Sequence, residues 1–353
     1  MLFRSSAAIY VEEADKVIIY LVAGTENYLS DGASYILTDP ESDEPNATLF
    51  SKADLTIDGA GSLTVTGNYN DGIASKDGLI INSGTLTAFA ADDGIRGKDY
   101  VLIRSANITI DANGDGIKSD EAEDSAKGWI IIESGTLNVR AGMDAIDAET
   151  AVTVESGAIT LVAGDGSTNA NFGDTDSMKG MKAGAIITSN GGTFNIQSTD
   201  DALHSNDSIL ITGGQFSIAT GDDGIHADTD LTIENGTITI TESYEGLESA
   251  TITINDGQIS IIASDDGINV AGGADSSGMN TDMGGRGGRN SGPGLDMFGG
   301  SGDYYLYLNG GTIYMNAGGG GLDSNGSIAM TSGTVVRSEE HTSELQSRQE
   351  ISY

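Results

Sequence analysis

Apolar and polar residues alternate along the chain in short runs that repeat from one segment to the next. In the segment 92–114, DDGIRGKDYVLIRSANITIDANG, Ile95 opens the first run, Val101 and Ile103 form the second, and the letters NITI form the third. Gly, Asn or Asp residues separate these runs. Alternation with a period of two, interrupted by turn residues, predicts three short β-strands in each segment. We see no apolar periodicity typical of a helix.

A turn motif of the form Asp-Gly-apolar introduces each segment and makes the repeat visible. Its clearest copies read NDGIASKD at Asn70, DDGIRGKD at Asp92, GDGIKSDE at Gly114 and DDGIHADT at Asp222. Successive copies lie mostly about 22 residues apart, a period typical of stacked coils. The longer step between Asp144 and Asp201 contains a further copy if Lys179 takes the place of the acid. The array then has about twelve units.

One such unit cannot bury its apolar side chains alone, but stacking each unit on the last creates a continuous core. We therefore predict an all-β fold, a single parallel β-helix of about 22-residue coils that spans residues 1–337. One apolar column should point inward throughout. Its members are Ile73, Ile95, Ile117, Ile146, Met181, Leu203, Ile225, Leu247, Ile268 and Leu322.

Three segments interrupt this pattern. We interpret residues 164–178 and the Gly- and Met-rich residues 271–302 as insertions, which we expect to form mobile loops outside the stack. Residues 338–353 depart from the composition of the rest and resemble a translated sequencing adapter, so we expect an artefactual tail. The N-terminus opens directly into strand-like sequence, and we expect a secretion signal to be missing from this fragment.

The chain is strongly acidic, because 53 Asp and Glu against 16 Lys and Arg give a formal net charge of −37. This charge repels phosphate backbones and anionic lipid headgroups, so we expect neither nucleic acid nor a membrane surface as a partner. No apolar stretch is long enough to span a membrane, and we predict no membrane insertion. The absence of cysteine excludes disulfide frameworks and thiolate metal sites. We expect a monomer whose partners are cations or ligands held by cations.

The acid of the turn motif recurs once per coil, so stacking predicts a ladder of carboxylates. Carboxylates about 5 Å apart repel each other by about 1 kcal/mol in water and about 3 kcal/mol at an effective dielectric constant of about 20. A cation would relieve this repulsion, and multiple oxygen donors favour Ca²⁺ over Zn²⁺ or copper. The candidate Ca²⁺ ligands are Asp71, Asp92, Asp93, Asp115, Asp144, Asp200, Asp201, Asp222, Asp223, Asp265 and Asp266. The alternative is turn chemistry, in which Asp bonds its own backbone and Gly takes positive φ; the two roles are compatible.

One residue beyond the apolar column, strand alternation should turn the side chain outward. Three basic residues and both histidines of the array fall there, and the candidate ligand-binding residues are Arg96, Lys118, Lys182, His204 and His226. Such a strip, flanked by Ca²⁺, would complement a chain of spaced carboxylates such as a polyuronate. The alternative is charge balance, in which Lys and Arg pair with neighbouring Asp at the surface.

The signals for catalysis are weaker. A polysaccharide lyase needs a Lys or Arg base beside a Ca²⁺-held uronate, and Arg96, Lys118 and Lys182 qualify by residue type alone. Glycoside hydrolysis needs two carboxylates at a set separation. In a chain with so many acids, many pairs could meet this requirement, so it does not identify a catalytic pair. We therefore predict a non-catalytic carbohydrate-binding protein. A Ca²⁺-dependent pectate lyase and a structural surface stalk or adhesin are the alternatives.

The units NYNDGIASKD, ADDGIRGKD, GDGIKSDE and TGDDGIHAD, with strands of the LTIDGAGSLTV type between them, resemble the clostridial-type bacterial carbohydrate-binding domain family related to pectate lyases. The resemblance runs from about Ala7 to Arg337. It implies a right-handed parallel β-helix that is extracellular or on the cell surface and binds Ca²⁺. It also implies binding of acidic plant polysaccharide (polygalacturonate or pectin) and of cellulose, without cleavage. Lys179 and Gly320 replace the acid in two slots and depart from the family pattern.

Overall fold

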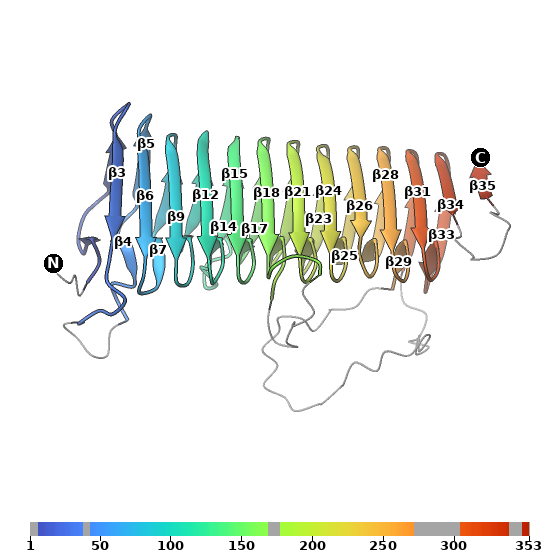
Figure 1. Cartoon of the computed structure of the whole chain (residues 1–353). Coiled ribbons are helices and arrows are strands. Elements are labelled where there is room, and N and C mark those ends of the chain that lie inside the picture. The colour runs from blue at the N-terminus through green and yellow to red at the C-terminus, as the bar shows by residue number, and fades with distance from the viewer. Residues whose placement is uncertain (1–5, 38–42, 169–176, 272–303, 339–347, 353) are drawn as a thin grey trace.

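The computed structural model describes residues 6–37, 43–168, 177–271, 304–338 and 348–352. The described strands form one elongated stack that runs from the N-terminal to the C-terminal end (Figure 1). This part of the chain consists of strands and turns without any helix, so it includes no helix that could cross a membrane. The all-β prediction is confirmed.

Each full coil contributes three short strands, and these build three rows along the stack. In one coil they are β10 (Ile95–Gly97), β11 (Tyr100–Ile103) and β12 (Ala106–Ala112). The first row also contains β1 (Ile9–Val11), β4 (Ala47–Ser51), β7 (Asp71–Ser75), β13 (Ile117–Ser119), β16 (Ile146–Ala148), β19 (Met181–Ala183), β22 (Leu203–Ser205), β29 (Ile268–Val270) and β32 (Leu322–Ser324). Two longer strands, β25 (Ile225–Ile233) and β27 (Leu247–Ile254), run through both the first and the second row.

The other strands complete the second and third rows. The second row also contains β2 (Val17–Leu21), β5 (Leu55–Gly59), β8 (Gly78–Ile81), β14 (Trp129–Ile132), β17 (Ala151–Val154), β20 (Ile186–Ser189), β23 (Ser208–Ile211), β30 (Tyr305–Leu308) and β33 (Ser327–Met330). The third row also contains β3 (Glu26–Ser30), β6 (Ser62–Gly67), β9 (Thr85–Ala90), β15 (Gly135–Ala141), β18 (Ala158–Ala163), β21 (Thr193–Ser198), β24 (Gln215–Thr220), β26 (Thr237–Glu242), β28 (Gln258–Ala263), β31 (Thr312–Ala317), β34 (Thr334–Ser338) and β35 (Arg348–Ser352).

Neighbouring strands within a row pair in parallel, except that β35 pairs antiparallel with β34. In the first row, Ile95 pairs with Ile73 on one side and with Ile117 on the other, and the linked coils are 22 residues apart. The next two steps are longer, 29 and 35 residues, yet Ile117 still pairs with Ile146, and Ile146 pairs with Met181. The pairing of Met181 confirms that the Lys179 segment fills a slot of the repeat. These repeated parallel registers are compatible with the predicted parallel β-helix.

The apolar faces of the rows enclose one continuous core. The predicted inward column from Ile73 to Ile268 is at most 1 % exposed, whereas Leu322 near the C-terminal end is half-buried. Phe194 and Phe216 also stack in this core, with ring centroids 4.3 Å apart. Burial of each large apolar side chain contributes about 1.5–3 kcal/mol, so this column holds successive coils together.

The predicted insertions and tail fall largely outside the described residues. The structure does not describe 169–176, 272–303 or 339–347. The loops expected within 164–178 and 271–302 therefore stay predictions. The interpretation of residues 338–353 as an added tail stays a prediction as well.

Candidate functional site

The predicted acidic ladder is present, and its carboxylates hydrogen-bond one coil to the next. Asp93 Oδ1 accepts a bond of 2.9 Å from the backbone N–H of Asp115, and Asp115 Oδ1 accepts one of 3.0 Å from that of Asp144. The same bond links Asp71 to Asp93, Asp144 to Lys179, Asp201 to Asp223, Asp223 to Glu245 and Asp266 to Gly320. Turn chemistry predicted bonds within one turn, whereas these bonds cross to the next coil. Each ladder carboxylate thus satisfies a backbone donor of its neighbour.

Burial makes negative charge on this ladder costly. Asp71 is 1 % exposed, and its Oδ2 has no hydrogen-bond partner among the residues that the structure describes. Burial and the charge of Asp93 raise the pKa of Asp71 to about 8. Burial and the charges of Asp144 and Asp147 raise the pKa of Asp115 to about 8. These carboxyl groups therefore hold protons near neutral pH unless a cation takes the protons' place.

The second acid of the doubled motif varies from coil to coil. Asp92 is exposed, Asp222 and Asp265 are half-buried, and Asp200 is fully buried. Tyr244 donates a hydrogen bond of 2.7 Å to Asp265 Oδ2. These four acids therefore do not form a row of equivalent metal ligands.

Lys179 places a cation in the ladder slot that precedes Asp201. Its Nζ lies 2.6 Å from Asp200 Oδ2 and 3.2 Å from Asp201 Oδ2, and all three side chains are fully buried. Burial opposes ionisation of Asp201, but the Lys179 charge and a hydrogen bond with His204 hold its pKa well below the usual range. Sequence reasoning noted Lys179 as a missing acid and missed its role as a buried counter-ion. The available signal was one lysine in an otherwise acidic column.

The three basic residues of the predicted strip are about one-quarter exposed, and each pairs with a carboxylate. Arg96 pairs with Asp120, with 3.2 Å between Nε and Oδ1. Lys118 contacts Asp115 of its own coil, and Lys182 pairs with Asp144 and Asp147 of the preceding coil. These contacts agree with charge balance, the alternative to an open anion-binding strip. The exposed quarter of each side chain is the part that remains accessible to a ligand.

The two histidines of the strip are buried, so the expectation of outward-facing side chains is wrong for them. His204 is 3 % and His226 is 1 % exposed, and their rings meet edge to face with centroids 4.9 Å apart. The physical reason is attraction to the ladder, since His204 Nδ1 lies 2.8 Å from Asp201 Oδ2. Burial disfavours the charged form of His226, but Asp223, Asp201 and Glu248 together raise its pKa to about 10.

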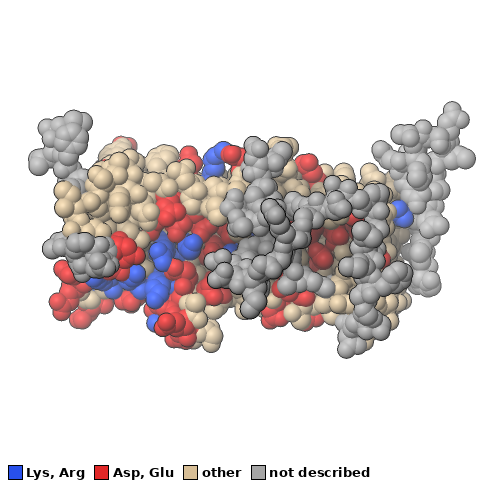
Figure 2. All heavy atoms as spheres, turned by 90° about the horizontal axis from the view of Figure 1, so that it is seen from below, with Lys and Arg blue, Asp and Glu red and all other residues tan. Residues whose placement is uncertain are grey.

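Three carboxylates form an oxygen cluster where the ladder meets the basic residues. One oxygen each of Asp115, Asp144 and Asp147 lies within 4.8 Å of the others. Lys118, Asp147 and Lys182 are register partners on β13, β16 and β19, so a lysine stands on either side of this cluster. Burial and the charge of Asp144 raise the pKa of Asp147 to about 6. Figure 2 shows one face of the molecule, on which Lys and Arg gather among Asp and Glu.

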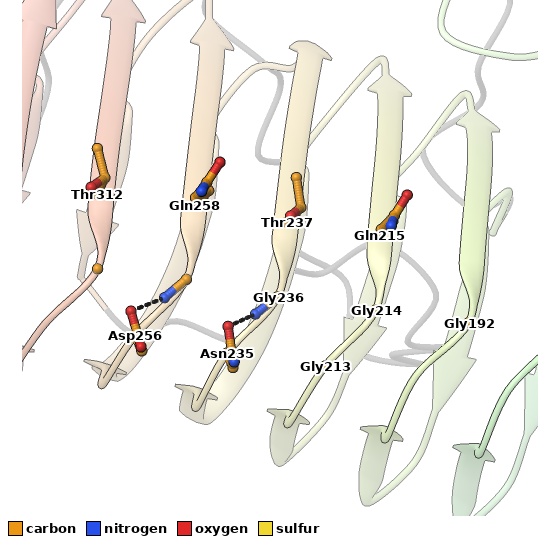
Figure 3. A pocket seen from close by; sticks show the side chains of 12 residues that line it. Gly192, Gly213, Gly214, Gln215, Asn235, Gly236, Thr237, Asp256, Gln258 and Thr312 are labelled. Carbon is orange, nitrogen blue, oxygen red and sulfur yellow. Dashed lines mark hydrogen bonds between the residues drawn. The ribbon is translucent and has the colours of Figure 1, made fainter.

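A second candidate surface is an open groove along the third row, at β24, β26, β28 and β31 (Figure 3). The groove has a volume of about 650 Å³, and Gln215, Thr237, Gln258 and Thr312 lie side by side along it. Apart from Asp256, the lining side chains are uncharged. Sequence reasoning missed this surface. The available signal was the recurrence of GGQ, NGT, DGQ and GGT at the head of the third strand.

Comparison with known proteins places these sites in a family. The sequence profile described as "Carbohydrate-binding domain-containing protein" matches residues 2–224 and 222–267. The chain belongs to this carbohydrate-binding domain family. The matched part of the carbohydrate-binding domain includes the acidic ladder as far as Asp266 and all the basic residues of the strip.

The chain is also similar to two individual proteins. A carbohydrate-binding domain-containing protein of Acetivibrio thermocellus is 44 % identical over 85 residues, which cover 24 % of this chain and 30 % of that relative. The match thus spans less than a third of the relative's length. The solved "polysaccharide lyase-like protein from C. thermocellum, Gadolinium derivative" is 35 % identical with a TM-score of 0.48, covering 53 % of this chain and 70 % of the other.

Proposed function

We propose that this carbohydrate-binding domain binds an acidic plant polysaccharide, polygalacturonate or pectin, through Ca²⁺ and without cleaving it. The observation that carries the proposal is the oxygen cluster of Asp115, Asp144 and Asp147 with Lys118 and Lys182 on either side. Family membership supports a polysaccharide partner. The alternation of carboxylate and lysine supports an anionic one.

Ca²⁺ suits the cluster because it takes about six to eight oxygen ligands and tolerates irregular geometry. Three protein carboxylates leave room for water and for a carboxylate of the polysaccharide. Burial, together with repulsion by Asp144 and Asp147, raises the pKa of Asp115, and the ion would relieve this repulsion. A uronate held there would lie beside the exposed parts of Lys118 and Lys182. The same reasoning extends the proposal to the other oxygen-only steps of the ladder, including those at Asp71 and Asp93.

The protonation of the basic residues favours binding over lyase chemistry. A lysine acting as general base must lose its proton near the working pH. Burial opposes the charge of Lys118, but Asp115 and Asp93 outweigh it and raise the pKa of Lys118 above its usual value. Asp144 and Asp147 raise the pKa of Lys182 in the same way. Both lysines therefore stay charged, as an electrostatic binding role requires.

The uncharged groove supports a second ligand class, a neutral glucan such as cellulose. Gln215, Thr237, Gln258 and Thr312 repeat amide and hydroxyl groups at strand spacings of about 4.8 Å. Such groups can exchange hydrogen bonds with sugar hydroxyls without requiring an ion. We propose that this groove accounts for any binding of cellulose, separately from the Ca²⁺ cluster.

The deciding experiment measures retention and turnover of polygalacturonate by the same protein sample, first with Ca²⁺ and then with a chelator. We expect Ca²⁺-dependent retention and no ultraviolet absorbance from unsaturated uronate products. New absorbance would establish the lyase instead. Retention on neither polygalacturonate nor cellulose would favour the structural stalk or adhesin.

The remaining expectations belong to the same proposal. We propose a monomeric, right-handed parallel β-helix with coils of about 22 residues. We also propose an extracellular or cell-surface location, where Ca²⁺ and plant polysaccharide are available.

A further inference from the structure

His226, on β25, is surrounded by carboxylates from its own coil and from the coils on either side. Its Nδ1 lies 3.5 Å from Asp223 Oδ2, 3.6 Å from Glu248 Oε2 and 3.8 Å from Asp201 Oδ2. The imidazole ring is 1 % exposed. One ring nitrogen thus faces three carboxylate oxygens, more than a single N–H can serve.

These distances match ligands around a common ion better than hydrogen bonds. A good N–H···O bond spans about 2.7–3.2 Å, and all three separations are longer. Donor atoms at the corners of a tetrahedron with metal–ligand bonds of about 2.0–2.1 Å lie about 3.4 Å apart. The separations of His226 Nδ1 from Asp223 and Glu248 are close to that value.

A carboxylate also lies near the second nitrogen of the ring, at a distance longer than a good hydrogen bond. His226 Nε2 lies 3.5 Å from Asp228 Oδ1. Ligating histidines commonly direct their second nitrogen to a carboxylate, which orients the ring and strengthens the first nitrogen as a ligand. Asp228 would take this orienting role.

The backbone holds the proposed ligands at a fixed spacing. His226 and Glu248 are register partners on the paired strands β25 and β27, and Asp223 precedes β25 by one turn. Asp201 belongs to the coil before and is already held by Lys179 and His204. We therefore take Asp201 as a neighbouring charge and the other three residues as ligands.

We propose that Asp223 Oδ2, His226 Nδ1 and Glu248 Oε2 form a site for Zn²⁺ or a similar first-row transition metal, distinct from the proposed Ca²⁺ cluster. Neutral imidazole nitrogen suits Zn²⁺, so binding would displace the proton from Nδ1 to solvent, whereas Ca²⁺ takes oxygen ligands. Three protein ligands leave one tetrahedral position for water or another group. The bound ion would fasten β25 to β27 and stabilise this part of the stack.

The test uses the full chain, which is first treated with chelator and then titrated with Co²⁺. Excess Ca²⁺ is present throughout, so that it fills the carboxylate sites that prefer Ca²⁺. We expect one Co²⁺ per chain, with the strong visible absorption of tetrahedral Co²⁺, and displacement of that ion by Zn²⁺. H226N and E248Q should remove this absorption, whereas D147N, in the Asp115–Asp144–Asp147 cluster, should leave it unchanged. H341N controls for the third histidine of the sequence.

The readout does not depend on any carbohydrate, so it is separate from the test of the proposed function. Far-UV circular dichroism verifies that each variant is folded. If H226N does not fold, E248Q alone provides the test. Absorption that persists in folded H226N or E248Q would overturn the proposal. Absence of Co²⁺ binding, or its displacement by Ca²⁺, would also overturn it.

Discussion

Lys179 Nζ lies 2.6 Å from Asp200 Oδ2, with both side chains fully buried. In a chain with a formal charge of −37 this pair is a local exception, because a cation occupies a slot that the repeat otherwise gives to an acid. Asp201 Oδ2 lies 3.2 Å from the same nitrogen. One lysine therefore compensates two adjacent buried carboxylates.

Replacing Lys179 should be strongly destabilising. Lys179→Met removes the cation between two buried carboxylates, and loss of one partner of a buried pair costs about 3–5 kcal/mol. The free energy of unfolding, measured by urea denaturation, provides the check. K127M is the matched control, because Lys127 pairs with Asp99 at 2.8 Å at the protein surface, and its loss should change stability little. Adding D200N to K179M should recover part of the loss, and equal effects of K179M and K127M would contradict this account.

Two substitutions of Asp71 distinguish the hydrogen-bonding role of the ladder carboxylates from the effect of their charge. Asp71→Asn keeps the oxygen that accepts the Asp93 N–H but removes the charge from a side chain that is 1 % exposed. Without Ca²⁺ at pH 8, D71N should be at least as stable as the original protein. D71A leaves the buried Asp93 N–H without that acceptor and should cost about 1–3 kcal/mol. Thermal unfolding of both variants tests this, and equal destabilisation would mean that the charge itself is needed.

The ladder predicts an unusual dependence of stability on pH in the absence of Ca²⁺. Burial and neighbouring carboxylates raise the pKa of Asp71, Asp115 and Glu245 to about 8. An acid with a raised folded-state pKa contributes stability that is fully present below its unfolded pKa of about 4 and is lost as the pH rises through the folded value. The free energy of unfolding should therefore fall between pH 5 and pH 8, by about 1.4 kcal/mol per pH unit for each group. The melting temperature should fall with it. The triple variant D71N/D115N/E245Q should reduce this slope, and an unchanged slope would contradict the assignment.

Ca²⁺ should act on this same ladder. A ligand that binds only the folded state at about 100 times its dissociation constant adds about 2.7 kcal/mol. Chelation should thus lower the melting temperature and Ca²⁺ should restore it, with a smaller response in D147N. Equal responses of D147N and the original protein would place the ion elsewhere.

Lys118 and Lys182 should determine retention on polygalacturonate. The double variant K118Q/K182Q removes two charges beside the oxygen cluster and should weaken binding at least about tenfold, or about 1.4 kcal/mol. Affinity electrophoresis in a polygalacturonate gel measures the effect, and K127Q controls for the general loss of positive charge. Unchanged retention in a folded double variant would rule out the lysine-flanked cluster as the binding site.

The groove should act independently of Ca²⁺. T237A/Q258A removes two side chains from the row of Gln215, Thr237, Gln258 and Thr312 that lies along it. The variant should reduce retention on cellulose several-fold, since each hydrogen bond contributes about 0.5–1.5 kcal/mol. Pull-down on insoluble cellulose measures this, with polygalacturonate retention as the internal control. Loss of both activities would indicate a general defect in the fold.

Much of the architecture follows from the sequence, because a repeat with constant spacing determines which residues share a column. Ile95 and Ile117 are register partners and are both buried, as alternation and the 22-residue step predicted. The ladder through Asp93 and Asp115 followed from the same step. Even Lys179 could be assigned to its slot, since the steps on either side of it preserve the register.

The tertiary structure decided what the columns do, because hydrogen bonding and burial depend on atoms from adjacent coils. Alternation assigned His204 and His226 to the outward side, yet both are buried beside carboxylates. His204 contacts Asp201 of its own coil, and His226 lies near Asp223 of its own coil and Glu248 of the next coil. Turn chemistry predicted a bond within each turn, whereas Asp93 Oδ1 accepts the Asp115 N–H of the next coil. The groove needs four third-row strands side by side, and no single segment of the sequence contains it. Spacing determines which residues become neighbours, and only packing determines which of them remain accessible to solvent and ligands.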